Sequence, residues 1–187
     1  MSQNLRNYTK AVYGFDHVIR TVPADRWDRP SPCDGWTAKD VALHAAGVVR
    51  MVEAAARGAA PVPHPDDLPV PAEVDPLAAW AAARDGVLEA LDHDGVLHKL
   101  VPSPFGEMLL DNLIGILLVD AVTHTWDLAR AVGGDERLPP ELVTVAHAGV
   151  TPLDEAIRGA GYFQAKIETA PGDDAQTAFL KFLGRKV

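Results

Sequence analysis

The sequence predicts an all-α protein, built as a four-helix bundle with additional short helices near its C-terminal end. Apolar residues recur at intervals of three and four along several segments, which is the spacing of one buried helix face. Strand-like alternation is confined to one short stretch, and no unit of about 20–50 residues repeats. With 187 residues, 48% of them hydrophobic, we expect one domain spanning 1–187.

The charge and the apolar runs of the chain argue against two classes of partner. A formal net charge of −9 and an isoelectric point near 5.1 would repel a phosphate backbone, so we expect no nucleic-acid partner. The longest apolar runs, such as 113–119, are too short to span a bilayer, so we expect no membrane partner. Cys33 is the single cysteine and no basic-then-apolar leader opens the chain, so we expect a cytoplasmic protein without disulfides.

The first predicted helix covers residues 3–22. Its apolar stripe consists of Leu5, Tyr8, Val12, Phe15, Ile19 and Val22. The connection at 23–36 holds three prolines and a glycine, so it is predicted to be irregular. We expect Trp27 and Trp36 to pack this loop against the end of the bundle.

The second predicted helix begins at Thr37, because Thr37 with Asp40 three residues later forms a capping-box pattern. The segment 58–76 that follows holds six prolines and is predicted to be a long loop. The apolar stripe of this helix runs through Val41, His44 or Ala45, Val48, Val52 and Ala55.

The third predicted helix is Ala-rich and covers about 77–91. After it, 96–110 alternates around a Pro and Gly turn, which indicates either a short hairpin or an extended crossover. The inward candidates of the third helix are Leu77, Trp80, Ala81, Val87 or Leu88, and Leu91.

The fourth predicted helix, 109–132, has the clearest helical spacing in the chain and ends at Gly133. Trp126 falls on another face of it and is expected to pack. A fifth helix is predicted to begin at Pro139 or Pro140 and to bend or end at Pro152, and the tail 173–187 predicts one more short helix. The inward residues of the fourth helix are Leu110, Leu113, Ile114, Leu117, Ala121, Leu128 and Ala131.

Three ionisable residues interrupt these apolar faces. Asp120 and His124 are four residues apart on the inner ridge of the fourth helix, and His44 lies on the inner stripe of the second. A buried carboxylate needs a partner, which is either a hydrogen bond from a neighbouring helix or a metal. The three residues therefore either form hydrogen bonds within the core or make a two-imidazole, one-carboxylate metal site with open positions.

The remaining candidates lack a partner at a useful spacing. Cys33 precedes a helix start, but no adjacent base marks it as a nucleophile, so we expect a small packed residue. The pair Gly133–Gly134 lacks the Lys-Ser or Lys-Thr of a phosphate loop. Four histidines in predicted loops or helix ends are expected to be solvated: His64, His93, His98 and His147.

Three stretches of the sequence resemble one known family. They are PCDGWTAKDVALHAAG at 32–47, LLVDAVTHTWDLARAVGGD at 117–135 and the terminal FLKFLGRKV. Together they resemble the mycothiol-dependent maleylpyruvate isomerase family, within the DinB/YfiT-like superfamily. The resemblance implies a DinB-like four-helix bundle and a divalent metal, usually zinc, held by His44, Asp120 and His124.

The resemblance also implies a chemistry. A small thiol of the mycothiol type would be directed at a small electrophilic substrate, as in a thiol transferase. Asp127, one turn after His124, would accept a hydrogen bond from a ligand imidazole or contact the Trp36 loop. Asp120 stands where the isomerase has Glu, a longer side chain for the same metal contact. The isomerase also carries a further C-terminal domain that contributes to its active site, so maleylpyruvate isomerisation is not expected. The alternative is a non-catalytic bundle that binds a ligand or a partner without metal, and a homodimer is left open.

Overall fold

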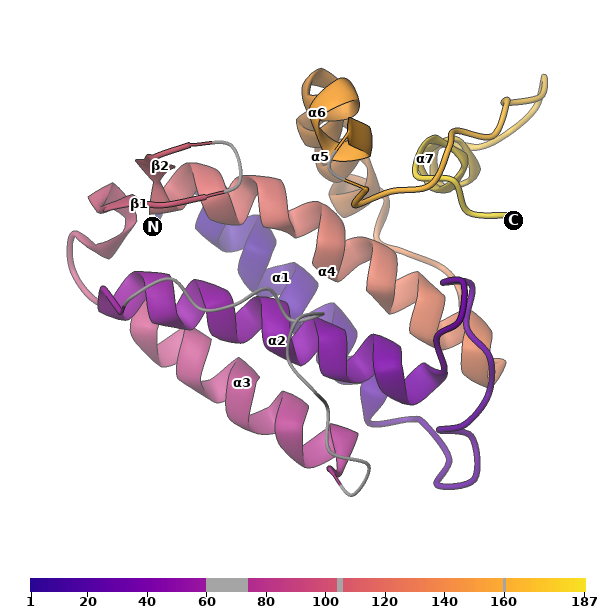
Figure 1. The fold of residues 1–187 in the computed structure, drawn as a ribbon, viewed down its shortest axis with the longest axis horizontal. Helices are drawn as coiled ribbons and strands as arrows, with labels where there is room; N and C mark the ends of the chain where they lie inside the picture. The colour runs from indigo at the N-terminus through magenta and orange to yellow at the C-terminus, as the bar shows by residue number, and fades with distance from the viewer. Residues whose placement is uncertain (60–73, 104–105, 160) are drawn as a thin grey trace.

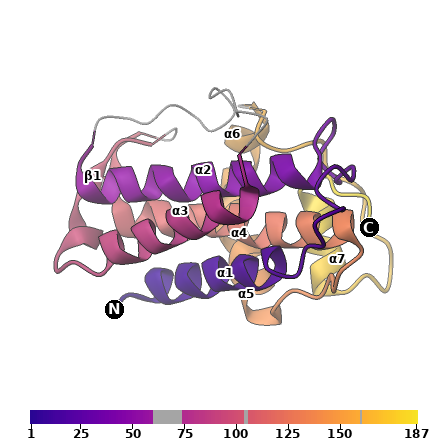
Figure 2. The same ribbon diagram turned by 90° about the horizontal axis from the view of Figure 1, so that it is seen from below.

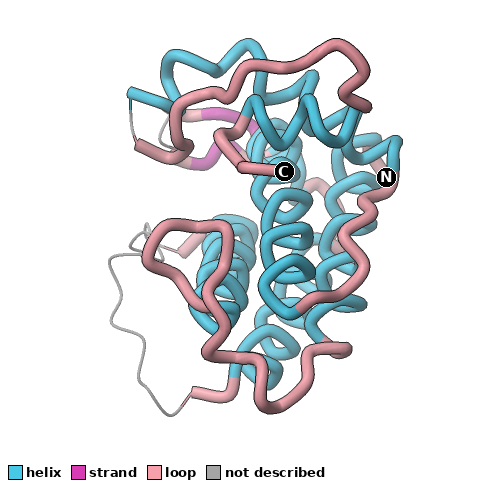
Figure 3. The backbone as a smooth tube through the Cα atoms, turned by 90° about the vertical axis from the view of Figure 1, so that its right-hand side faces the viewer, coloured by secondary structure: helices cyan, strands magenta, loops and turns pink. Residues whose placement is uncertain are grey.

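The computed structural model describes residues 1–59, 74–103, 106–159 and 161–187, and it confirms the all-α prediction (Figure 1). Helix dominates the fold in every view, as the colouring of Figure 3 shows. Four long helices build the bundle: α1 (Gln3–Ile19), α2 (Ala38–Arg57), α3 (Pro76–Leu91) and α4 (Leu110–Val132).

Helix α2 is flanked by α3 and α4. It packs against α3 on one side and α4 on the other, while α1 packs against α4 (Figures 1 and 2). The shared core contains Phe15, Val41, Trp80, Ile114 and Leu128, all of them buried. The neighbouring positions of α2 and α4 bring the inner faces of both helices together.

Helix α1 ends at Ile19, three residues before the predicted end at Val22. The reason is local, because Val22 precedes Pro23, and a residue before proline is disfavoured in the helical region. The backbone of 20–22 instead closes a turn, in which the Thr21 amide donates to the Val18 carbonyl at 2.9 Å.

The start of α2 confirms the predicted capping box. The Asp40 amide donates to Thr37 Oγ1 at 3.3 Å, and the Thr37 amide donates to Asp40 Oδ2 at 2.8 Å. The helix ends at Gly58, whose φ of +73° is left-handed. Most of the predicted loop 58–76, with His64, lies outside the described residues.

The inner face of α3 differs from the prediction at Leu77, which is 37% exposed. Pro76 occupies the buried position in the first turn instead, and the small residues Ala83 and Ala90 complete the buried face with Trp80. In an Ala-rich helix the hydropathy pattern does not identify the buried face, because alanine occurs on both faces.

A short hairpin joins α3 to α4, which decides between the two alternatives for 96–110. After the short 3₁₀ helix η2 (Val96–His98), strand β1 (Leu100–Val101) pairs antiparallel with β2 (Met108–Leu109). Its register pairs Leu100 with Leu109 and Val101 with Met108.

The C-terminal helices pack on the other side of α4. They are α5 (Pro140–Val150), α6 (Asp154–Gly159) and α7 (Ala175–Phe182), with a 3₁₀ turn η3 (Thr151–Leu153) after α5, so the predicted break at Pro152 and the tail helix are confirmed. Between α4 and these helices lies a second hydrophobic core, and Trp126 is fully buried in it, as expected. Among the described helices, none combines the length and apolarity that crossing a membrane requires.

Candidate metal centre

Helices α2 and α4 bring His44, Asp120 and His124 together. Asp120 Oδ2 lies 3.2 Å from His44 Nε2 and 3.4 Å from His124 Nε2. One donor atom from each residue lies within 4.8 Å of the other two. The three residues that the sequence placed on inner helix faces therefore converge, and two imidazole nitrogens and a carboxylate oxygen are a donor set that zinc accepts.

The three side chains form a charged cluster. Burial opposes the charge on His124, but the charge of Asp120 and hydrogen bonds with Asp120 and Asp127 outweigh it and raise the pKa of His124 well above its usual 6.5. Burial likewise opposes ionisation of Asp120, but His124 and His44 outweigh it and lower the pKa of Asp120. The carboxylate is therefore ionised, which is the form that binds a cation.

Trp36 covers the imidazoles. Its ring centroid lies 4.9 Å from that of His44 and 6.0 Å from that of His124, and the two imidazoles meet edge-on at 4.8 Å. Trp27 and Trp36 both pack against the core, as predicted, but the contact of Trp36 with the two histidines was not predicted. The indole restricts the rotation of both rings and keeps water from one side.

A second cluster adjoins the first and shares His124. Asp127 Oδ2 lies 2.9 Å from His124 Nδ1 and accepts a bond from the Cys33 thiol at 3.4 Å. The Arg185 guanidinium donates to Asp127 at 2.9 Å through Nη2 and reaches Cys33 Sγ at 3.4 Å. Asp127 thus makes both predicted contacts, because it holds His124 and also touches the loop that carries Trp36.

Among the residues that the structure describes, two donor sets are available for a metal, one around Asp120 and one made of Cys33, His124 and Asp127. The second set already holds a cation, since Arg185 bonds both Cys33 and Asp127, and a divalent metal would have to displace it. With Nδ1 of His124 engaged by Asp127, Nε2 points to the first set. A metal at His44, Asp120 and His124 would leave Arg185 in place and would displace the proton of His124 Nε2.

The structure tests the expectations for Cys33 and for three of the histidines. Cys33 packs against the core, as expected, but no sequence pattern indicated that Asp127 and His124 lie beside it, because that contact joins residues 94 positions apart. His147 was expected to be solvated, but it packs on Phe179 and Phe182 with centroid distances of 5.8 and 5.1 Å. His93 and His98 are exposed as expected.

Sequence reasoning also missed Arg185. It lies after the last helix, in the terminal stretch FLKFLGRKV, which carried part of the family resemblance but suggested no role for this side chain. The contact that gives it a role joins residues 58 positions apart. The one available signal was indirect: a buried Asp127 needs a cationic or hydrogen-bonding partner somewhere in the chain.

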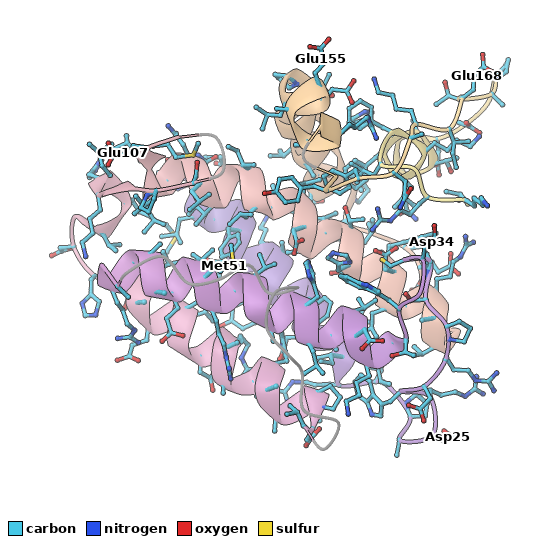
Figure 4. All side chains as sticks on the ribbon, in the orientation of Figure 1. Asp25, Asp34, Met51, Glu107, Glu155 and Glu168 are labelled. Atoms are coloured by element: carbon cyan, nitrogen blue, oxygen red, sulfur yellow. The ribbon has the colours of Figure 1, made fainter. Side chains whose placement is uncertain are left out.

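The cluster opens into a cavity of about 980 Å³. The cavity is lined by the loop before α2, by α2 and α4, by β1, and by the segments around 161–164 and 184–185. Figure 4 labels two of its residues: Asp34 in the loop and Met51 on α2, which lie far apart along the molecule. His44, Asp120 and His124 line the same cavity, so a bound metal would be reachable by a small molecule.

Comparison with known proteins identifies the family. The profile described as the mycothiol maleylpyruvate isomerase N-terminal domain matches residues 9–129, which include His44, Asp120, His124 and Asp127. The chain belongs to this family. Arg185 lies beyond the matched residues.

Relatives of the same length also match. Two uncharacterized proteins of Mycobacterium tuberculosis, from strains CDC 1551 / Oshkosh and ATCC 25618 / H37Rv, are each 31% identical over 186 residues. The alignment covers 98% of this chain and 98% of each relative, so this member of the mycothiol maleylpyruvate isomerase N-terminal domain family aligns with them over nearly its whole length. No solved structure matches.

Proposed function

We propose that the protein is a divalent-metal-dependent thiol transferase, which joins a small thiol of the mycothiol type to a small electrophile. One observation carries the proposal: two imidazoles and one ionised carboxylate converge within 4.8 Å at the wall of a large cavity. The family name supports a thiol of the mycothiol type.

The residues present fit a zinc ion. The donor set is two nitrogens and one oxygen, which suits zinc in catalytic sites, where three protein ligands leave a position open. Asp120 Oδ2 lies 3.2 and 3.4 Å from the two histidine nitrogens, so its short side chain is long enough to offer a ligand atom beside both imidazoles. When bound, zinc favours the thiolate form of a coordinated thiol and so supplies a nucleophile near neutral pH.

The surrounding residues position the ligands. Asp127 binds the His124 Nδ1–H at 2.9 Å and so leaves Nε2 as the ligand atom. Arg185 keeps that carboxylate ionised: burial opposes the charge of Asp127, but His124 and Arg185 outweigh it and lower its pKa. Trp36 shields both imidazoles from water on one side.

Elemental analysis and an activity assay test the proposal. Protein purified without a metal-affinity tag should carry about one equivalent of zinc. With zinc and mycothiol, it should convert monochlorobimane to its thioether, which forms as the thiol sulfur displaces chloride from carbon and a proton is released. His124→Ala should lose both metal and turnover, whereas His17→Ala, an exposed histidine of α1, should keep both.

A second candidate is a ligand-binding protein without metal. Its supporting observation is that Asp120 already pairs with both histidines at 3.2 and 3.4 Å. Protein with no bound divalent metal, unchanged by added zinc and inactive with mycothiol, would favour this second function.

A further inference from the structure

The residues that line the cavity differ in chemistry on the two sides of the candidate metal centre, and these two sides are here called its arms. On one side lie polar residues of the loop and of the C-terminal segment, among them Asp34, Gln164 and Arg185. On the other side a groove, here called the apolar arm, runs between α2 and α4 toward β1. The apolar arm is lined by Val48, Met51, Val52, Ala55, Leu113, Ile116 and Leu117.

The apolar arm is long. Between His44 and Ala55 the chain advances eleven residues along α2, which at 1.5 Å per residue is about 16 Å. Leu117 and Leu113 follow Asp120 back along α4 in the same direction, since both line the cavity and both helices flank it. The groove is therefore longer than a compact electrophile of a few atoms requires.

The charges at the cavity wall argue against an anionic substrate in this arm. Among the described residues that line the cavity, the one lysine is Lys99. Its Nζ donates a hydrogen bond to the carbonyl of Ala56, near the end of α2, at 2.7 Å. The Arg185 guanidinium, in the other arm, is bonded to Asp127. Both cations already bind groups of the protein, whereas the walls between Val48 and Leu113 are hydrocarbon.

We propose that the apolar arm binds an uncharged aliphatic chain, whose electrophilic head group lies at the metal centre. The placement of the head group at the metal centre rests on the proposed function, whereas the binding of the aliphatic chain does not. The occupant follows from the continuity of the groove with His44 and Asp120, from its length, and from its hydrocarbon walls. Each methylene that leaves water for such walls contributes about 0.8 kcal/mol, which is roughly a fourfold change in Kd.

Displacement of an uncharged fluorescent probe tests this inference without metal or thiol. Chelator-treated protein is loaded with N-phenylnaphthylamine, and straight-chain primary alcohols of increasing length compete for the site. The Kd should fall about fourfold per methylene and then level off once the chain fills the arm. Failure of the thiol chemistry would leave this result intact, and active conjugation with chain-independent binding would overturn only the present inference.

A bulky substitution should move the plateau. Ala55→Phe fills the far end of the arm, so the Kd should level off at a shorter alcohol, while short alcohols bind as before. Ala82→Phe makes the same change at an exposed position of α3 and should leave the series unchanged. Met51→Lys, at a half-buried position inside the arm, should weaken long alcohols by roughly tenfold or more.

Circular dichroism of each variant establishes that it is folded. If Ala55→Phe does not fold, Met51→Lys decides with the same series. An unchanged series in the folded variant, or no dependence of Kd on chain length in the wild type, would overturn the proposal.

Discussion

The guanidinium of Arg185 lies 2.9 Å from the carboxylate of Asp127, across 58 residues of sequence, and both side chains are buried. This ion pair ties the C-terminal tail to α4 directly behind His124. Gly184 makes the approach feasible: its φ is +85°, and a Cβ there would lie 2.6 Å from Gln164 Cβ.

Arg185→Met should lower the free energy of unfolding by about 3 kcal/mol, because it removes one of the two cationic partners of the buried Asp127 carboxylate. Urea denaturation measures the loss. Arg137→Met breaks an exposed pair with Asp135 and should change stability little. The double variant Arg185→Met/Asp127→Asn removes the charge as well and should recover part of the loss. A single variant as stable as the wild type would contradict the role given to Arg185.

Metal should stabilise the fold through His44, Asp120 and His124. Zinc at a hundredfold excess over its Kd should add about 2.7 kcal/mol, and a chelator should remove that increment. His124→Ala should abolish the response to both additions, while His17→Ala should keep it. Melting curves with zinc and with chelator measure this. If neither zinc nor chelator changes the melting temperature of the wild type, the cluster serves as a set of core hydrogen bonds.

Asp16 should make the bundle sensitive to acid. It accepts bonds from Arg20 at 2.7 Å, from Trp80 at 3.1 Å and from Arg84, and so links α1 to α3. Burial works to raise the pKa of Asp16, but these bonds outweigh it and lower the pKa below 3.8. A lowered folded-state pKa stabilises the fold above pH 3.8, and this contribution is lost as the pH falls through the folded value.

The comparison with Asp16→Asn isolates that effect. The variant should be less stable at pH 7 and should lose less stability than the wild type as the pH falls below about 4. Urea midpoints at a series of pH values measure both. Parallel curves for the two proteins would show that Asp16 contributes nothing to the acid response.

The capping box should carry part of the stability of α2. Thr37→Ala removes the acceptor of the Asp40 amide and should cost about 1 kcal/mol. Thr37→Ser keeps the hydroxyl and should retain most of it. Thermal or urea unfolding of both variants measures the difference, and equal losses in the two would show that the hydroxyl is not what stabilises the helix start.

Local physics made most of the helices predictable. A helix cap and an apolar repeat each depend on residues only a few positions apart. The capping box at Thr37 marks the start of α2 and the left-handed Gly133 marks the end of α4, and the structure has both boundaries at these residues. The convergence of His44 with Asp120 and His124 was foreseeable for a related reason, because residues on the inner faces of neighbouring helices meet in the core.

The tertiary structure alone decided the rest. The sequence by itself determined the four long helices, most of their buried faces and the three residues that face each other, since these follow from periodicity. It did not determine that Cys33 and Arg185 would meet at Asp127, or that His147 would pack on two phenylalanines. Contacts across 94 and 58 residues leave no local pattern, because they depend on how the loop before α2 and the tail after α7 fold over α4.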